Sequence, residues 1–141
     1  MTFENPSPDE LRALFEGSRR IAIVGLSDKA WRSSHQIGVY LLEQGFEIVP
    51  VYPRHEEILG RKVYRNVAEI PEQVDIVDVF RRSEFLPGVV EDALSARLRP
   101  AAVWFQLGCV HEEAAARAQR GGLKVVMDRC IAVEHGRLLG A

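Results

Sequence analysis

The sequence predicts an α/β domain of three layers, with helices on both faces of a parallel sheet. Two patterns lead to this fold class. Short apolar runs rich in β-branched residues, such as Ile21–Val24, recur along the chain, which is typical of strands covered on both faces. Segments with apolar residues at helical spacing alternate with these runs. Since 141 residues are enough to bury one such core, we expect a single domain over residues 1–141.

The first half of the chain predicts a helix and then a strand, helix and strand. Ser7–Glu10 is a helix-start signal with a proline just inside the helix, and residues 20–25 form the first strand. The next helix runs from about residue 34 to residue 44, and Gly45 ends it. The second strand spans residues 46–53 and ends in a rigid turn bracketed by two prolines.

The second half predicts three more strands, separated by two helices. The helices start at Ser83 and Glu112, and Pro100 and the Gly121-Gly122 pair end them. The third, fourth and fifth strands are expected at residues 75–80, 101–106 and 123–127.

Two segments give no clear pattern. Residues 54–71 indicate a loop with at most a short strand near residues 62–64, and residues 129–139 fit a short helix or a strand equally well. We expect the five strands in a Rossmann-like order, 3-2-1-4-5. Ligands of such sheets bind beyond the carboxyl ends of the strands, at the switch point between the first and fourth strands.

The loop after the first strand has the features of an anion site. Gly25 ends the strand, and a polar loop leads into the next helix. Ser33 and Gln36 have the spacing of a capping box, so we expect the first amides of that helix to point back into the loop. A strand, a glycine turn and a helix N-terminus in this order predict a bound phosphate.

The same region does not match a standard dinucleotide site. The G-x-G-x-x-G fingerprint is incomplete, because Ser27 and Ala30 stand where glycines would be. The second strand ends in Pro50-Val-Tyr-Pro53 and offers no carboxylate for a ribose hydroxyl. Cations near the strand ends fit a ligand with more phosphate than NAD carries, and these are Lys29, Arg32, Arg54 and Arg81.

Composition limits the other functional classes. The formal net charge of −2 gives no support to a nucleic-acid or acidic-membrane partner. No apolar run approaches the ~18 residues of a membrane span and the N-terminus does not resemble a signal peptide, so we expect a cytoplasmic protein. Cys109 and Cys130 are then expected to be free thiols. No cysteine or histidine spacing predicts a metal site, and we assign no catalytic residue.

These features together resemble a known family. The sequence is similar to the small stand-alone CoA-binding proteins of bacteria and archaea, and to the CoA-binding domain of the succinyl-CoA synthetase α subunit. The resemblance covers about residues 18–137 and rests on five motifs in a fixed order. The motifs are Val24-Gly-Leu-Ser-Asp-Lys29 with Arg32 and Ser34, Gly45-Phe-Glu-Ile-Val-Pro-Val-Tyr-Pro53, Val77-Asp-Val-Phe-Arg-Arg-Ser83, Trp104-Phe-Gln-Leu-Gly108 and Val126-Met-Asp-Arg-Cys130.

The resemblance implies where the ligand lies. The glycine-serine loop and the helix after it would hold the pyrophosphate, the proline turn would border the adenosine, and the turn after the third strand would lie by the same ligand. Tyr52 replaces the family's usual Asn, so that polar contact is not carried over, but its ring can stack on adenine. Ser33 stands where Pro is common and keeps its amide. The expected CoA-binding residues are Gly25, Ser27, Lys29, Arg32, Ser33, Ser34, Pro50, Tyr52, Pro53, Phe80, Arg81, Gln106 and Gly108.

The resemblance implies that the chain binds coenzyme A or an acyl-CoA without catalysis of its own. The synthetase needs further domains for catalysis, and 141 residues cannot hold them. Two alternatives are a small NAD(P)- or flavin-linked oxidoreductase and a non-catalytic interaction subunit. Cys109 and Cys130 follow the fourth and fifth strands, so we expect both thiols at the carboxyl edge. One alternative is that both thiols are buried and act only in packing, which is the commoner role of a free cysteine. An exposed Cys109 would instead form a mixed disulfide with oxidised CoA.

Overall fold

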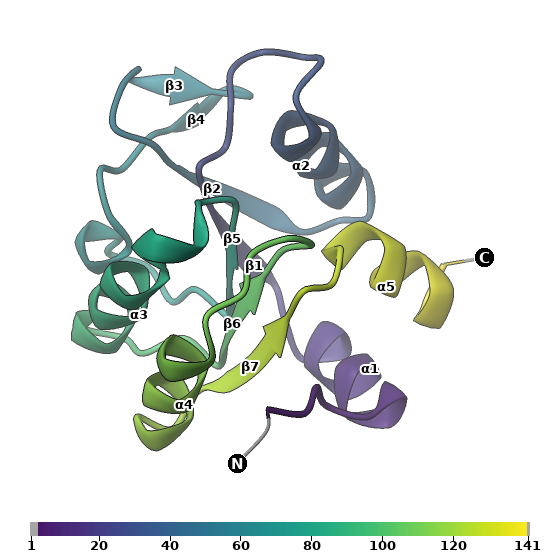
Figure 1. The fold of residues 1–141 in the computed structure, drawn as a ribbon. Coiled ribbons are helices and arrows are strands. Elements are labelled where there is room, and N and C mark those ends of the chain that lie inside the picture. The colour runs from purple at the N-terminus through teal and green to yellow at the C-terminus, as the bar shows by residue number, and fades with distance from the viewer. Residues whose placement is uncertain (1–2, 141) are drawn as a thin grey trace.

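The computed structural model describes residues 3–140 and contains a five-stranded parallel sheet (Figure 1). Its strands, in spatial order, are β2 (Glu47–Val51), β1 (Arg20–Val24), β5 (Ile76–Val79), β6 (Ala102–Phe105) and β7 (Lys124–Met127). In register, Val24 pairs with Val51 on one side and with Val79 on the other, so the carboxyl ends of the three strands are level. The predicted fold class, a Rossmann-like α/β domain with five parallel strands, is confirmed.

The strand order depends on how a short extended segment is counted. Tyr64 forms one parallel bridge with Val51, on the side of β2 away from β1. When this segment is counted as the third strand, the order is 3-2-1-4-5-6, which contains the predicted 3-2-1-4-5 with one further strand at the far edge. Over the five long strands alone the order is 2-1-3-4-5, because the strand predicted at residues 75–80 lies beside β1 and not outside β2.

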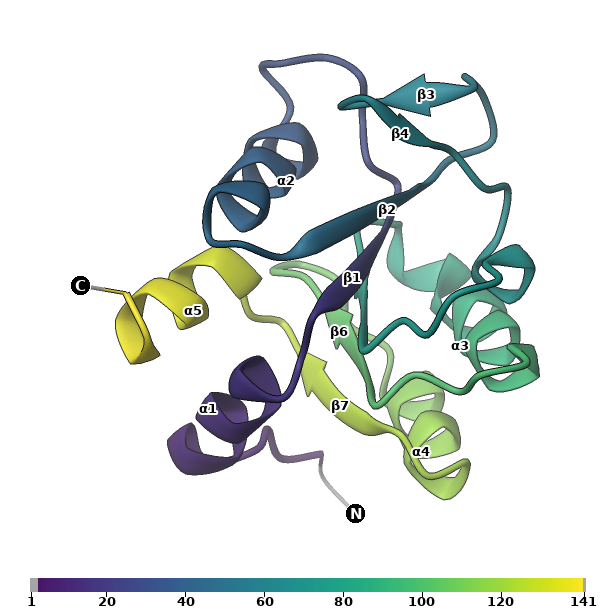
Figure 2. The same cartoon turned by 180° about the vertical axis from the view of Figure 1, so that it is seen from behind.

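Helices cover both faces of the sheet, as Figures 1 and 2 show from opposite sides. One face carries α3 (Leu86–Ser95) and α4 (Glu112–Arg120), and the other carries α1 (Pro8–Glu16), α2 (Ser33–Glu43) and α5 (Ile131–Leu138). Within β1, Ala22 and Val24 pack toward the first group and Ile21 and Ile23 toward the second, which explains why the strand is apolar throughout. Among residues 3–140, no helix has the length and apolarity that a membrane span requires.

The two segments that gave no clear sequence pattern are both ordered. Residues 54–71 contain a small antiparallel hairpin of β3 (Glu57–Ile58) and β4 (Arg61–Lys62), followed by the 3₁₀ turn η1 (Val67–Glu69). A second 3₁₀ turn, η2 (Ser83–Phe85), precedes α3. Residues 129–139 contain the helix α5, so the strand alternative for this segment was wrong.

One polar side chain lies inside the sheet layers. Asp78 is fully buried in the middle of β5, between Ile23 and Trp104 of the neighbouring strands. Neither carboxyl oxygen has a hydrogen-bond partner among residues 3–140. Burial therefore raises the pKa of the Asp78 carboxyl well above its ordinary value, which favours the neutral acid.

Candidate functional site

The site begins at the glycine that ends β1. Gly25 has a φ of +89°, and its N–H donates to the Val51 carbonyl of the neighbouring strand at 2.8 Å. A Cβ on Gly25 would collide with the carbonyl oxygen of Phe80, at the end of β5. Glycine is thus required here both by backbone conformation and by the close approach of a second strand end. This packing turns the chain sharply over the carboxyl edge.

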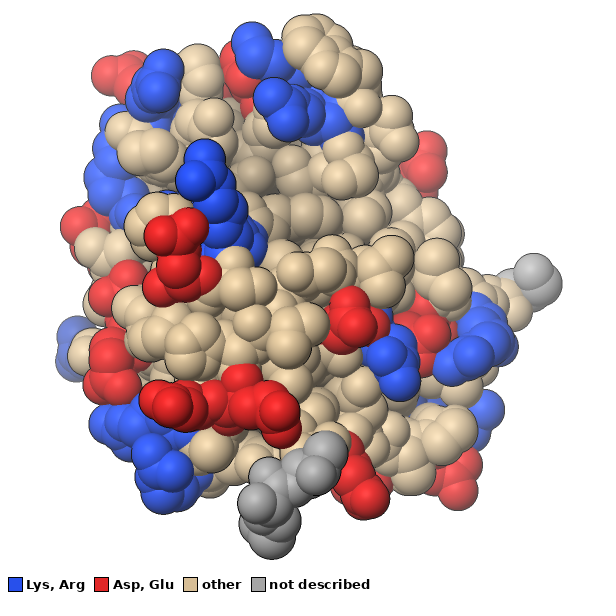
Figure 3. Space-filling model, in the orientation of Figure 1, with Lys and Arg blue, Asp and Glu red and all other residues tan. Residues whose placement is uncertain are grey.

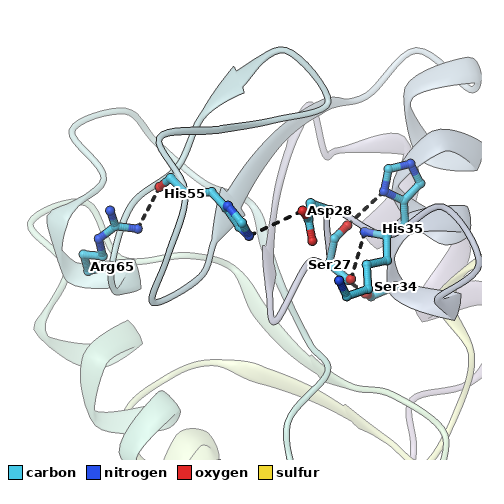
Figure 4. Close-up of polar contacts among 7 residues, drawn as sticks. Ser27, Asp28, Ser34, His35, His55 and Arg65 are labelled. Atoms are coloured by element: carbon cyan, nitrogen blue, oxygen red, sulfur yellow. Dashed lines mark hydrogen bonds and ion pairs between the residues drawn. The ribbon is translucent and has the colours of Figure 1, made fainter.

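The loop after Gly25 is held by the first turn of α2 (Figure 4). The Ser27 N–H donates to the Ser34 hydroxyl oxygen at 3.0 Å, and the Ser27 carbonyl accepts from His35 Nδ1–H at 2.9 Å. The Lys29 N–H donates to the Ser27 hydroxyl oxygen at 3.0 Å. Because Ser34 is almost fully buried, these bonds fix the loop on the helix.

The start of α2 differs in detail from the sequence prediction. Arg32 is the N-cap residue, with extended backbone, and no side chain accepts from the first amides of the helix. The predicted capping box between Ser33 and Gln36 was wrong. The side-chain Nε2 of Gln36 instead donates to the backbone carbonyls of Ala30 and Trp31, at 3.4 Å each. The first turn of α2 also contains no acidic residue. An uncapped N-terminus of this kind favours an external anion.

Two adjoining hollows open where these elements meet, and Gly25, Tyr52 and Phe80 line both of them. The smaller has a volume of about 320 Å³ and lies against the glycine-serine loop and α2, lined also by Ser27, Lys29, Arg32, Ser33 and Ser34. The larger has a volume of about 590 Å³ and lies on the α3 side, lined also by Val24, Val51, Pro53, Arg54, Arg65, Asn66, Val67, Arg81, Arg82, Phe85, Val89 and Asp92. We call the two hollows together the cleft. Its combined shape suits an elongated small molecule.

The cleft is strongly cationic although the protein is slightly acidic overall. Figure 3 shows blue cationic side chains on both sides of a hollow in the upper half of this face. The cations that line the cleft are Lys29, Arg32, Arg54, Arg65, Arg81 and Arg82. Among residues 3–140, Arg82 is the one member of this set with an ion pair, at 3.9 Å to Glu84. The other five positive charges therefore have no carboxylate partner, which is typical of an anion-binding site.

Asp92 is the one acidic residue, among residues 3–140, that lines either hollow. Burial, and then the neighbouring charge of Glu69, raise the pKa of its carboxyl above the ordinary value. Both causes act against the charged form of this carboxyl.

Comparison with known proteins identifies the family. Residues 19–136 match the protein family described as CoA binding domain. The chain belongs to this CoA-binding domain family. It is 44% identical over 132 residues to the uncharacterized protein YneT of Bacillus subtilis, covering 94% of this chain and 96% of that one. A solved hypothetical protein from Pyrococcus horikoshii superposes with a TM-score of 0.91 and 36% identity, covering 99% of this chain and 100% of that one.

A larger relative matches only in part. The acetate–CoA ligase (ADP-forming) I subunit alpha of Pyrococcus furiosus is 38% identical over 88 residues, which make up 58% of this chain and 19% of that subunit. The CoA-binding domain family therefore includes both stand-alone chains of this length and a region of a longer ligase subunit.

Most of the predicted CoA-binding residues lie together in the cleft of this family member. These are Gly25, Ser27, Lys29, Arg32, Ser33, Ser34, Tyr52, Pro53, Phe80 and Arg81. The other three do not line it. Pro50 lies within β2, Gln106 is buried and accepts from the Ile131 N–H at 3.0 Å, and Gly108 donates its N–H to Asp128 at 2.8 Å. Gln106 and Gly108 thus have structural contacts that their motif did not indicate.

The structure also adds residues that sequence reasoning missed. Val89 and Asp92 lie on one side of α3 at i and i+3, and Phe85, at the end of η2, comes four residues before Val89. Helical spacing was therefore the signal that could have found them. Arg65 and Asn66 come from the segment without a clear pattern, and no sequence signal placed them at the cleft.

The cysteines are free thiols, as predicted, but Cys109 is buried. Its Sγ donates to the carbonyls of Arg81 at 3.1 Å and of Val79 at 3.7 Å. Burial raises the pKa of the Cys109 thiol, which disfavours the reactive thiolate. The condition for the predicted mixed disulfide, an exposed Cys109, is therefore not met. Cys130 is half-buried just before α5.

Proposed function

We propose that the chain binds coenzyme A or an acyl-CoA in the cleft, through the glycine-serine loop, without catalysis of its own. Membership of the CoA-binding domain family supports the ligand class. The observation that carries the proposal is the set of unpaired cations beside the uncapped N-terminus of α2. Both features favour phosphate, and CoA carries a diphosphate and a separate 3′-phosphate.

The two hollows suggest how the ligand is arranged. The smaller hollow would take the diphosphate, because the free amides of α2, Lys29 and Arg32 converge there. The larger hollow would take the 3′-phosphoadenosine, since it combines an apolar floor including Val51 and Val89 with several arginines. Tyr52, which lines both hollows, would lie between the two parts of the ligand.

The proposal does not extend to the reaction of the ligase relative. This chain covers 19% of the ligase subunit's length, so the subunit's activity depends largely on residues that have no counterpart here. We therefore propose a CoA-binding role.

Calorimetric titration of the purified protein with CoA tests the proposal. Arg32→Ala should weaken binding by about 1–3 kcal/mol, because a charge-assisted bond to phosphate is lost. Arg12→Ala is the matched control, since Arg12 pairs with Asp9 on α1, away from the cleft. Absence of CoA binding by the wild-type protein would refute the function, and equal affinity in Arg32→Ala and wild type would refute the placement of the diphosphate.

A further inference from the structure

An ion pair crosses between the two loops that flank the smaller hollow. Asp28 belongs to the loop after β1, and His55 belongs to the turn after β2. The Asp28 carboxylate lies 3.5 Å from His55 Nε2 (Figure 4). The residues on either side of Asp28, Ser27 and Lys29, line the smaller hollow, whereas Asp28 itself does not. Asp28 therefore connects the proposed phosphate loop to another element and leaves the floor of the hollow free.

The His55 side of this contact is held rigidly. The imidazole ring stacks on the ring of Tyr52, with centroids 5.6 Å apart and an interplanar angle of 17°. Arg65 donates to the backbone carbonyls of Tyr52 and His55 at 3.0 Å and 2.9 Å. His55 also has a φ of +69°, a conformation that a residue other than glycine keeps only where its surroundings enforce it.

The Asp28 side is also anchored. Ser27, the residue before it, is bonded through its N–H and its carbonyl to Ser34 and His35 at the start of α2. The ion pair thus joins two fixed supports, the first turn of α2 and the turn held by Arg65. Between these supports lies Tyr52, which lines both hollows.

We propose that Asp28 and His55 form a latch that positions the phosphate loop and the Tyr52 ring for ligand binding. The latch rests on the proposed function for its ligand. His55 acts as a positioning residue through Asp28 and Tyr52. The physical basis is preorganisation, because a loop that is already ordered loses less entropy when the ligand binds.

The sign of the effect separates the latch from simple electrostatics. Asp28 is a negative charge next to a proposed phosphate site, so removing it should strengthen binding if charge alone matters. If the latch matters, removing Asp28 should weaken binding although the site becomes more positive. Asp28→Asn therefore gives opposite results under the two explanations.

The size of the effect follows from the surroundings of the pair. The groups that face His55 are the Asp28 carboxylate, the Tyr52 ring, and the Arg65 guanidinium, which contacts the backbone and not the imidazole. The side chains of His55 and Asp28 have 39% and 42% of their surface exposed. An ion pair that is exposed to this extent changes an equilibrium constant by up to about fivefold.

The test is a comparison of CoA dissociation constants for wild type, Asp28→Asn and His55→Phe, measured under one set of conditions. His55→Phe keeps an aromatic ring to stack on Tyr52 and removes the partner of Asp28. The constant of each variant is divided by that of the wild type. We expect both variants to bind about threefold to fivefold more weakly than wild type. Asp9→Asn, which removes an exposed carboxylate on α1, is the charge-matched control and should give a ratio near one.

Two results of this comparison would overturn the latch. One is binding by Asp28→Asn that is as tight as that of wild type or tighter, and the other is an unchanged affinity in His55→Phe. A second measurement needs no ligand. Amide hydrogen exchange of residues 26–31 at pH 6 should be faster in both variants than in the wild type, and equal exchange would overturn the positioning role. Failure of the wild-type protein to bind CoA would refute the proposed function instead, and exchange would then decide the latch alone.

Discussion

Gly25 shows that a residue can be predicted correctly for an incomplete reason. Sequence reasoning placed a glycine turn at the end of the first strand and explained the glycine as part of a phosphate site. In the structure the carbonyl of Phe80 occupies the position into which a Cβ would project, and the φ is +89°. The packing of two parallel strand ends therefore requires glycine before any ligand is considered. A sequence motif gives the residue type but does not separate these two causes.

Substitution of Gly25 should consequently affect the fold. We expect Gly25→Ala to lower the free energy of unfolding by about 3 kcal/mol or more, because left-handed strain is added to overlap with a backbone atom. Gly45→Ala is the matched control, since Gly45 has a φ of +96° with no atom within 4 Å of the added Cβ, and should cost about 1–2 kcal/mol. Urea unfolding of the two variants measures the difference, and equal losses would show that Phe80 moves aside easily.

Asp78 shows a residue-scale feature that the sequence could not predict. In an apolar run with one aspartate, the natural expectation is that the strand ends there and the carboxylate is solvated or capped. The register of β5 against β1 and β6 instead places Asp78 between two buried neighbours. Register is a property of three strands together, so no single stretch of sequence contains it.

At the scale of elements, α5 was the helix whose sequence pattern was least clear. Its buried residues are Ile131, Glu134 and His135, which follow the helical spacing i, i+3 and i+4. Glu134 and His135 are polar residues, so the sequence shows no run of apolar residues at helical spacing, although the buried positions follow that spacing. His135 itself is buried among aromatic side chains. Phe15, Tyr40 and Phe46 surround its ring at centroid distances of 5.1–5.7 Å, and its Nδ1 lies 2.9 Å from the Tyr40 hydroxyl oxygen.

The docking of α5 through His135 should make stability depend on pH. Burial lowers the pKa of His135, so the folded protein disfavours the protonated ring. A lowered pKa means that stability is complete above the unfolded value of about 6.5 and decreases as the pH falls from there toward the folded pKa. We expect the wild-type free energy of unfolding to fall between pH 7.5 and pH 5.5 more steeply than that of His135→Phe.

Chemical denaturation across this pH range measures the two slopes. The slopes are the relevant quantity, because His135→Phe also removes the partner of the Tyr40 hydroxyl and lowers stability at every pH. Val133→Ala, a change at an exposed position of the same helix, should keep the wild-type slope. Parallel profiles for wild type and His135→Phe would contradict the assignment of the pH dependence to this ring.

At the scale of the whole molecule, alternation of strands and helices was sufficient to predict the layers but not the details of the sheet edge. Pro50 lies in β2, where its carbonyl accepts from the Tyr64 N–H while the proline itself has no N–H to donate. Pairing on that side is therefore limited to the bridge at Tyr64 and its flanking hydrogen bonds. The same short pairing brings Arg65 and Asn66 to the cleft, which explains why the cleft contains residues from a segment whose sequence had no clear pattern.

The distribution of charge over the whole molecule predicts a ranking of ligands. The net charge is −2, so attraction of anions is local to the cleft. CoA should bind more tightly than 3′-dephospho-CoA, because the larger hollow offers Arg54, Arg81 and Arg82 to the 3′-phosphate.

NAD should bind at least about tenfold more weakly than CoA, a difference of ~1.4 kcal/mol in binding free energy. The reason is that Tyr52 and Pro53 follow β2, at the place where a ribose-binding carboxylate would be needed.

Calorimetry with the three ligands at low and high salt checks this ranking. The affinity for CoA should fall more steeply with salt than the affinity for NAD, because more of its binding comes from partly exposed charges. Equal affinities for CoA and 3′-dephospho-CoA would show that the arginines of the larger hollow do not contact the 3′-phosphate. Binding of NAD as tight as that of CoA would instead favour the oxidoreductase alternative, because ordinary dinucleotides would then satisfy the same cations.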